Sequence, residues 1–301
     1  MKALITGSAG FVGRHFRTHL ERSGWDVEPV DILGATSSTD ALWFFKNVTD
    51  MRYDLVIHAA ARGPNRRAID LAPSNMHYNT MLDAAMFEWA TRTRQPHVVY
   101  LSSAAVYSDD LTRDDEDGRI PFREHRIGFY PFDRYGEEKR HGELMADAAR
   151  ACGVQVTVVR PFSGYGSDQS EDFPFGAFIQ RAVRREDPFH IWGNSMQVRD
   201  FIHIDDVVAG TLALVDAGVT KPVNLCTGVP TSMLDLAVRV IGVYNELAEK
   251  KYDPVIEEIR NAPMGVRYRV GDPGLLHTWY APTITVADGV REALREALED
   301  E

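Results

Sequence analysis

Near its amino end the chain reads Gly7-Ser8-Ala9-Gly10-Phe11-Val12-Gly13, which spaces three glycines three residues apart. This stretch follows the apolar segment Lys2–Thr6, which has the pattern of a buried strand, and it opens an amphipathic segment over residues 11–23. Between a strand and a helix, such glycines permit a tight turn, close approach of the backbone to a pyrophosphate and close packing of the helix on the strand. The stretch therefore predicts a dinucleotide-binding turn.

An acidic residue stands where such a turn requires one. Asp31 ends the second strand-like segment, Asp26–Asp31, and lies 18 residues beyond Gly13. A carboxylate at this position accepts hydrogen bonds from the adenosine ribose hydroxyls and repels a 2′-phosphate. Asp31 thus favours NAD as the cofactor, while Arg14 keeps NADP open as the lesser alternative.

The first half of the chain alternates short β-branched runs with longer amphipathic stretches, which is the rhythm of a parallel sheet covered by helices. The expected strands are Lys2–Thr6, Asp26–Asp31, Leu55–Ala59, His97–Ser102 and Gln155–Arg160. The expected helices cover residues 11–23, 75–92 and 134–151, with a weaker one over 38–46. In a doubly wound sheet of this kind, ligands bind beyond the carboxyl ends of the strands.

Beyond Arg160 the rhythm becomes irregular. The expected elements there are a helix over 175–186, a helix over Ile202–Asp216 and a strand over Pro222–Cys226. We therefore predict an α/β fold, a doubly wound parallel Rossmann sheet with a smaller C-terminal substrate-binding lobe. The expected NAD-binding domain is 1–162, with 202–227 returning to it, and the expected lobe is 163–201 with 228–301.

The composition narrows the possible partners. Of the 301 residues 44% are hydrophobic and 26% charged, as in ordinary globular proteins, and the net charge of −11 disfavours polyphosphate backbones and anionic membranes. Cys152 and Cys226 are too few for a disulfide framework or a zinc site, and no stretch of about 18 apolar residues is present. We expect a cytoplasmic protein that binds neither nucleic acid, nor membrane, nor a metal ion.

Three residues form a candidate catalytic group. Ser103 follows the expected strand that ends at Ser102, and Tyr135 and Lys139 lie four residues apart, on one face of the expected helix over 134–151. A lysine ammonium at this position stabilises the tyrosine phenolate and lowers its pKa, so that Tyr135 can exchange a proton with an alcohol. Ser103 adds a hydrogen bond to the reacting oxygen.

With these motifs the chain resembles the extended short-chain dehydrogenase/reductase superfamily, and in particular the NAD-dependent epimerase/dehydratase family that acts on nucleotide sugars. The resemblance runs over nearly the whole chain and includes Asn79, Val159-Arg160-Pro161-Phe162 and the segment Trp192–Asp206. It implies bound NAD, a nucleotide-diphosphate sugar as substrate and a homodimer held by a four-helix bundle. The helices that would pair are those over 75–92 and 134–151, whose apolar residues include Met76, Leu82, Met86, Trp89, Leu144, Met145 and Ala148.

The resemblance also implies roles for residues of the site. Arg199 and Arg269 are expected to clamp the substrate diphosphate, because each guanidinium can bind a phosphate bidentately. The expected substrate contacts are Ser103, Ala104, Ser163, Arg199 and Arg269. The expected cofactor contacts are Gly7, Ala9, Gly10, Phe11, Val12, Gly13, Asp31, Ile32, Asn47, Val48, Ala59, Ala60, Ala61, Asn79, Ser102, Tyr135, Lys139 and Pro161. Asp206 is expected to cap the helix that begins there.

The residues after Ser103 narrow the reaction. In the family that this chain resembles, NAD⁺ removes a hydride from a sugar carbon while the tyrosine takes the hydroxyl proton, and epimerases then return the hydride to the opposite face. The 4,6-dehydratases also eliminate water and carry an acidic residue after the serine or threonine, where this chain has Ala104 and Ala105. We therefore predict a C4 epimerase. An NAD(P)-dependent 4-keto-sugar reductase is the main alternative, ahead of a 4,6-dehydratase and a non-catalytic dinucleotide-sensing module.

Overall fold

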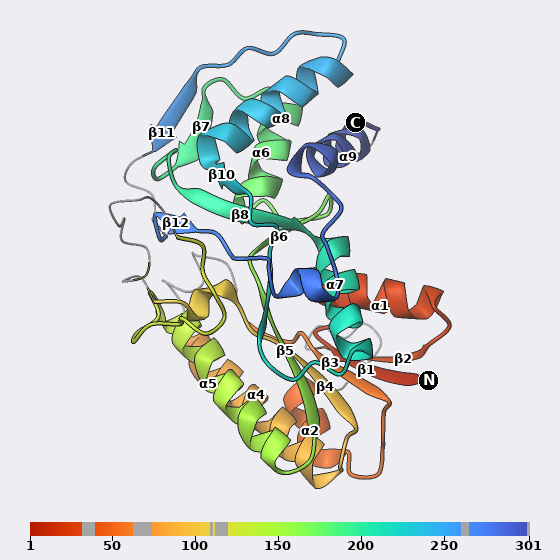
Figure 1. Ribbon diagram of the computed structural model, residues 1–301. Coiled ribbons are helices and arrows are strands. Elements are labelled where there is room, and N and C mark those ends of the chain that lie inside the picture. The colour runs from red at the N-terminus through yellow and green to blue at the C-terminus, as the bar shows by residue number, and fades with distance from the viewer. Residues whose placement is uncertain (32–39, 63–73, 109–110, 112–119, 260–264, 300–301) are drawn as a thin grey trace.

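The computed structural model describes residues 1–31, 40–62, 74–108, 111, 120–259 and 265–299 (Figure 1). Its largest sheet has six strands, all parallel, in the order β2-β1-β3-β4-β5-β9. These strands are β1 (Lys2–Thr6), β2 (Asp26–Val30), β3 (Leu55–His58), β4 (His97–Leu101), β5 (Gln155–Pro161) and β9 (Val223–Leu225). The chain places β2 on one side of β1 and β3 on the other, which creates the switch point of a doubly wound sheet. The predicted fold class is confirmed.

Helices cover both faces of this sheet (Figure 1). One face carries α2 (Ala41–Asn47), α4 (Ser74–Arg92) and α5 (Arg134–Ala151), and the other carries α1 (Phe11–Arg22) and α7 (Ile204–Asp216). Side chains alternate across a strand, so Leu4 packs toward α4 while Ala3 and Ile5 pack toward α1 and α7. Among the described helices, none combines the length and the apolar composition that crossing a membrane requires.

The remaining elements gather at the top of Figure 1, apart from the six-stranded sheet. The strands of this second group, which we call the lobe, are β6 (Ser163–Tyr165), β7 (Phe189–Trp192), β8 (Val198–His203), β10 (Pro230–Ser232), β11 (Ile256–Ile259) and β12 (Tyr268–Arg269). The helices of the lobe are α6 (Pro174–Val183), α8 (Met233–Leu247) and α9 (Val286–Glu299), which share one apolar core. Two single 3₁₀ turns, η1 (Ala104–Val106) and η3 (Leu276–Thr278), follow β4 and β12 respectively.

The predicted boundaries agree with the structure best in the first half of the chain. The five predicted strands match β1 to β5 to within one residue at their carboxyl ends, and the helix over 134–151 is α5 itself. The predicted helix over Ile202–Asp216 starts two residues too early, because Ile202 and His203 end β8.

The predicted capping role of Asp206 is wrong. The cap of α7 is His203, whose Nδ1 accepts a hydrogen bond from the Asp205 backbone N–H at 3.2 Å. Asp206 lies in the first turn of the helix and accepts hydrogen bonds from the Tyr280 hydroxyl at 2.5 Å and from the Ile284 backbone N–H at 3.0 Å. It therefore anchors the segment before α9 instead of capping α7, whose cap lies three residues earlier, at His203.

Most of the apolar residues that were expected to pack between two subunits pack inside the monomer instead. Leu82, Met86 and Trp89 are at most 1% exposed and belong to the core between α4 and the sheet. Leu144 on α5 and Met81 on α4 point outward instead, with exposures of 64% and 53%. The periodicity of α4 therefore reflects packing inside the monomer.

Candidate active site

The glycine turn joins β1 to α1. Gly7 has a φ of +71°, and a Cβ built on it would lie 2.7 Å from the Ala59 backbone. A Cβ on Gly13 would lie 2.1 Å from the Gly7 carbonyl oxygen. Side chains are therefore excluded at both positions. Gly10 caps α1, so the amino end of this helix, which favours anions, opens at the same turn.

Asp31 and Arg14 bear on the choice between NAD and NADP. Asp31 directly follows β2, and its Oδ2 accepts a hydrogen bond from the Ala9 backbone N–H at 2.8 Å. Arg14 is held elsewhere, because its Nε donates to the Asp168 carboxylate at 2.6 Å and its Nη2 to the Asp168 carbonyl at 2.9 Å. A carboxylate thus stands at the turn, while the cation that kept NADP open is paired with another carboxylate.

Six further residues predicted to contact the cofactor lie along the carboxyl edge of the sheet. They are Phe11 and Val12 at the start of α1, Ala59, Ala60 and Ala61 after β3, and Pro161 at the end of β5. All have small or apolar side chains, so they offer a packing surface rather than hydrogen bonds. This edge is where ligands of doubly wound sheets bind.

The end of α2, which was predicted to flank the adenine, is tied to its own helix and to α4. Asn47 donates from Nδ2 to the Trp43 carbonyl at 2.7 Å, and the Val48 carbonyl accepts a hydrogen bond from the Trp89 indole at 2.8 Å. Ile32, the other predicted contact in this region, lies outside the described residues.

Two polar residues predicted to contact the cofactor are bonded within the protein. The Ser102 hydroxyl donates to Glu143 at 2.5 Å. Asn79 donates to Glu138 at 3.1 Å and accepts a hydrogen bond from the Arg62 backbone N–H at 2.8 Å. Both side chains are buried and help to hold α5 against β4 and α4. Neither bond was predicted from the sequence.

The three candidate catalytic residues meet at the carboxyl end of β4. Ser103 follows this strand, and its hydroxyl is near enough to Tyr135 to lower the pKa of the phenol. The Lys139 Nζ lies 5.9 Å from the centre of the Tyr135 ring. A Cβ on Gly136 would lie 2.1 Å from the Ala105 carbonyl oxygen, so glycine at this position allows α5 to approach η1 closely. This close approach makes the contact between serine and tyrosine possible.

The pKa of Tyr135 is raised, whereas the sequence predicted that it would be lowered. Burial raises this pKa, Lys139 and Ser103 lower it, and Glu138 raises it. The net result is a pKa above the ordinary value of tyrosine, because desolvation of the phenolate outweighs the nearby ammonium. The contribution of Lys139 has the predicted sign. The predicted net lowering is wrong, because the sequence does not show how the phenol is enclosed.

A buried cluster of ionisable side chains surrounds Lys139. The ammonium lies 4.0 Å from Glu138 Oε1 and 5.2 Å from the centre of the Tyr100 ring. Asp83 on α4 accepts a hydrogen bond from the Tyr100 hydroxyl at 2.6 Å and lies 3.0 Å from His58 Nε2. Burial raises the pKa of Asp83, but Lys139, His58 and Tyr100 together bring it below its usual range. Burial lowers the pKa of Lys139, and Asp83 is the largest of the influences that raise it overall.

A cavity of about 300 Å³ is lined both by residues next to the six-stranded sheet and by residues of the lobe. Ala105 lines it from η1 and Tyr135 from α5, while Arg199 and Arg269 line it from β8 and β12. One cavity therefore contains the candidate acid/base group and both arginines predicted to bind a diphosphate. Three predicted substrate contacts are not among the lining residues: Ser103, which precedes η1, Ala104, which begins η1, and Ser163, which begins β6.

The two arginines are neighbours across adjacent strands. Arg269 of β12 lies opposite Arg199 of β8 in the register of the sheet. Arg199 donates to the Val198 carbonyl at 2.8 Å, and no carboxylate in the described part of the chain forms an ion pair with it. Burial, followed by the charge of Arg269, lowers the pKa of Arg199 to about 9. Two like charges held together in this way favour binding of an anion.

Two of the lining residues that had no role predicted from the sequence are Trp192 and Arg181. Trp192, the last residue of β7, is 61% exposed, and the Arg181 guanidinium lies 5.8 Å from the centre of its ring. The available signal for the tryptophan was its place directly before Gly193, in the segment that carries Arg199. Nothing in the sequence distinguishes Arg181 from a surface arginine.

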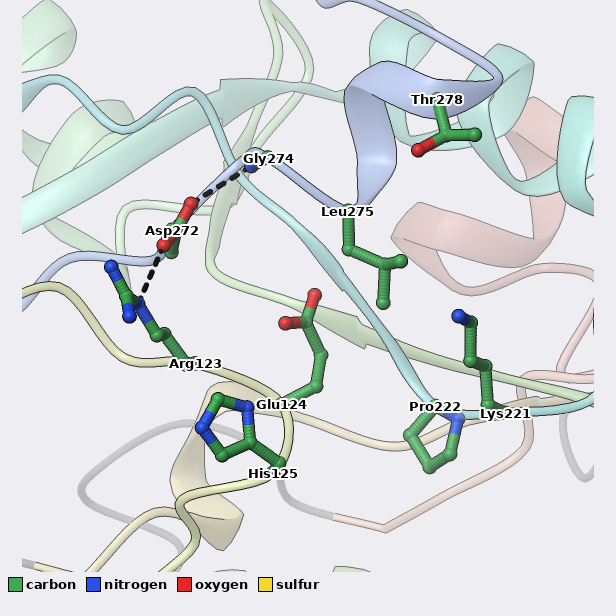
Figure 2. A pocket seen from close by; sticks show the side chains of 9 residues that line it. All are labelled: Arg123, Glu124, His125, Lys221, Pro222, Asp272, Gly274, Leu275 and Thr278. Atoms are coloured by element: carbon green, nitrogen blue, oxygen red, sulfur yellow. Dashed lines mark hydrogen bonds and ion pairs between the residues drawn. The ribbon is translucent and has the colours of Figure 1, made fainter.

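A second hollow, of about 610 Å³, lies away from these residues (Figure 2). Its charged groups are engaged with the protein: the Arg123 Nε donates to Asp272 at 2.9 Å, and Glu124 accepts a hydrogen bond from the Asn224 backbone N–H at 3.0 Å. None of the predicted catalytic, cofactor or substrate residues lines it. The smaller cavity is therefore the candidate active site.

Comparison with known proteins identifies the family. The model of the NAD dependent epimerase/dehydratase family matches residues 3–226, which is more than half of the chain. The chain belongs to this family. The predicted family, the predicted NAD cofactor and the prediction of an NAD-dependent enzyme of this family are thereby confirmed.

Two curated relatives share about a quarter of their residues with the chain. It is 26% identical over 300 residues to the dTDP-4-dehydro-6-deoxy-D-allose reductase of a Streptomyces species, covering 89% of this chain and 87% of the relative. It is also 26% identical over 332 residues to GDP-mannose 3,5-epimerase 1 of Oryza sativa subsp. indica, covering 100% of this chain and 83% of the relative.

The family fold is also found among solved structures. The UDP-glucuronic acid 4-epimerase from Bacillus cereus, solved in complex with UDP-glucuronic acid and NAD, matches the chain with a TM-score of 0.79 at 22% identity. The match covers 100% of this chain and 99% of the epimerase. At this identity the likeness shows a shared fold.

Proposed function

We propose that the protein is a nucleotide-sugar epimerase that acts at C4, with NAD bound at the sheet edge and Tyr135 as the acid/base group. The observation that carries the proposal is the single cavity that joins Tyr135 to Arg199 and Arg269, with Ala105 lining it as well. It offers a proton acceptor for a sugar hydroxyl and two cations for a diphosphate, as the epimerase reaction requires.

The cavity argues against a dehydratase. Ala105, which supplies only a methyl group, stands where elimination at C5 and C6 would need an acid and a base. Three acidic residues line the cavity: Asp133, Glu171 and Asp172. Asp133 caps α5 and Glu171 forms an ion pair with Arg184 at 2.6 Å, so these two carboxylates have structural partners.

The residues at the sheet edge fit the NAD of this family. Gly7 and Gly13 leave no room for side chains, so the backbone of the turn and the amino end of α1 would bind the pyrophosphate. Asp31 would accept hydrogen bonds from the adenosine ribose hydroxyls. When bound, NAD⁺ supplies a hydride acceptor that can later return the hydride to the same sugar.

The side chains at the carboxyl end of β4 would handle the proton. In its phenolate form Tyr135 accepts the proton of the C4 hydroxyl, and it returns this proton to the oxygen when the hydride returns to C4. Lys139 stabilises the phenolate form of Tyr135, and Ser103, which precedes η1 near Tyr135, donates to the reacting oxygen.

The lobe would bind the nucleotide and leave the sugar free to rotate within the cavity. Arg199 and Arg269 bind the diphosphate, and the exposed Trp192 ring offers a surface on which the base can stack. Because these contacts lie on the nucleotide, the sugar can present either face to the cofactor without release. This separation of binding from chemistry suits an epimerase.

The test is to incubate the purified protein with UDP- or dTDP-hexoses and no added cofactor. We expect C4 epimers to interconvert, measured by chromatography of the sugars, without net accumulation of reduced nicotinamide. A 4-keto-6-deoxy product would show a dehydratase instead. A strict requirement for added NADPH and a 4-keto sugar would identify the reductase alternative, which the 26% identity to a reductase keeps in view.

The domain boundaries, the cellular location and the oligomeric state are also proposals. We infer an NAD-binding domain of 1–162 with 202–227 and a substrate lobe of 163–201 with 228–301, which agrees with β9 joining the six-stranded sheet. We infer a cytoplasmic homodimer that pairs α4 and α5, supported by the outward-pointing Met81 and Leu144. Sedimentation at micromolar concentration tests the dimer, and a monomer there would reject it.

A further inference from the structure

A buried carboxyl group, Glu138, faces the Lys139 ammonium and has no part in the reaction proposed above. Its side chain is 2% exposed, and its Oε2 accepts a hydrogen bond from Asn79 at 3.1 Å. Its Oε1 lies 4.0 Å from the Lys139 Nζ and has no hydrogen-bond partner among the described residues. A buried carboxyl oxygen without a hydrogen bond is costly, so its position next to the catalytic lysine requires an explanation.

The polar and ionisable groups that bear on Glu138 come from three neighbouring elements. They are Tyr135 and Lys139 on α5, Asn79 and Asp83 on α4, and Tyr100 on β4, with His58 of β3 behind Asp83. Of the described groups around Glu138, Lys139 is the cation that favours its ionised form. Glu138 and Tyr135 therefore compete for the stabilising charge of one ammonium.

We propose that Glu138 is a positioning residue for the proton transfer of Tyr135, because its charge offsets that of Lys139 and so sets how readily Tyr135 gives up its proton. This inference rests on the acid/base role of Tyr135 in the proposed function. Glu138 is not among the residues that line the cavity, so it acts through Lys139 rather than on the substrate.

The direction of the effect follows from the charges. Burial raises the pKa of Glu138 to about 7, against the opposing effects of Lys139 and Asn79. Below this pH the carboxyl is neutral, and Lys139 acts on Tyr135 undiminished. Above it the carboxylate opposes Lys139 and raises the pKa of Tyr135. In exchange, ionised Glu138 joins Asp83 in keeping the buried Lys139 protonated.

The first test compares Glu138→Gln with the wild-type protein over a range of pH. Glutamine keeps the hydrogen bond from Asn79 and removes the charge. Removing a nearby like charge lowers a pKa by about one unit, so above pH 7 the variant should reduce bound NAD about tenfold faster with a nucleotide sugar. The ratio of the two rates should fall to about one at pH values where Glu138 of the wild type is protonated, because neither protein then carries a charge at this position. KM should not change.

The control is Glu137→Gln, which makes the same chemical change at the preceding, partly buried residue of α5. We expect its rate ratio to the wild type to stay near one at every pH. A ratio for Glu138→Gln that does not vary with pH would overturn the proposal, because a purely structural role lowers the rate equally at all pH values.

A second test needs no substrate. The ultraviolet absorbance of phenolate, taken as the difference between each NAD-loaded protein and its Tyr135→Phe counterpart, reports the titration of Tyr135. This titration should move down by about one pH unit in Glu138→Gln. Glu138→Met provides a second variant should glutamine prevent folding, since apolar replacement of a buried charge is often tolerated. An unshifted titration in the folded variant would reject the role of Glu138. A shifted titration without epimerisation would reject the proposed function alone.

Discussion

The surroundings of Lys139 and of Arg199 show two opposite treatments of buried positive charge. Lys139 faces the carboxyl groups of Asp83 and Glu138, so the protein itself balances its charge. Arg199 lies beside Arg269 and has no carboxylate partner in the described part of the chain. A charge that the protein balances keeps its place with or without a ligand, whereas a buried cation such as Arg199, held next to a second arginine, favours binding of an anion. The first arrangement suits a fixed catalytic group, and the second suits a site that binds and releases a diphosphate.

The largest expected effect is on the group that Lys139 serves. Tyr135→Phe removes the acid/base hydroxyl and should lower kcat by about 10²–10⁴-fold. The fold and the NAD content should be unchanged, because the hydroxyl is not needed for either. Steady-state epimerisation assays with measured NAD occupancy check this. Turnover near that of the wild type would show that Tyr135 is not the acid/base group.

The next effect concerns the balance of charge at Lys139. Asp83→Asn keeps the shape of the side chain but leaves the buried ammonium without its main counter-charge, so the free energy of unfolding should fall by about 3 kcal/mol at pH 7. Because the pKa of Asp83 is lowered in the folded protein, this stabilisation is present above the carboxyl pKa of the unfolded chain. It is lost as the pH falls through the folded value.

Denaturant titration of Asp83→Asn measures this difference. The control is Asp147→Asn on the outer face of α5, where an exposed pair with Arg150 should contribute less than about 1 kcal/mol. Equal stability of Asp83→Asn and the wild type would mean that Lys139 does not depend on a fixed counter-charge.

The arginine pair should respond in the opposite way. Arg199→Ala removes a charge-assisted clamp worth about 1.5–3 kcal/mol, so KM for a nucleotide-diphosphate sugar should rise roughly 10- to 100-fold. The ligand-free protein should lose little stability, because the substitution also relieves repulsion from Arg269. A large loss of stability with unchanged KM would remove the contrast between the two regions.

The smallest expected effect lies at the glycine turn. Asp31→Ser removes the carboxylate that repels a 2′-phosphate, and the preference for NAD over NADP should fall by about tenfold, or roughly 1.4 kcal/mol. Fluorescence titration with each cofactor measures it. Arg14→Ala is the matched control and should leave the preference unchanged, because Arg14 is bound to Asp168. Equal binding of NAD and NADP by the wild type would show that Asp31 has no selective role.

The features of this protein that its sequence determines are those that depend on the spacing of residues close together in the chain. Three features could be predicted because each depends on neighbours within a few positions. They are the glycines of residues 7–13, the alternation of strands and helices up to Arg160, and the four-residue spacing of Tyr135 and Lys139. The family resemblance extended this to Arg199 and Arg269, whose motifs are also short. The short strands of the lobe, such as β6, β10 and β12, escaped prediction, since two or three residues carry no period.

Only the tertiary structure decided which charges meet. Asp83 and Lys139 stand 56 positions apart in the chain, and their contact arises because α4 and α5 pack side by side on one face of the sheet. The same packing buried Glu138 and raised the pKa of Tyr135, which spacing on a single helix had predicted to fall. Desolvation depends on everything that surrounds a group, and in this protein those surroundings come from elements distant in sequence. The sequence therefore determined which residues can react, and the fold determined how acidic they are.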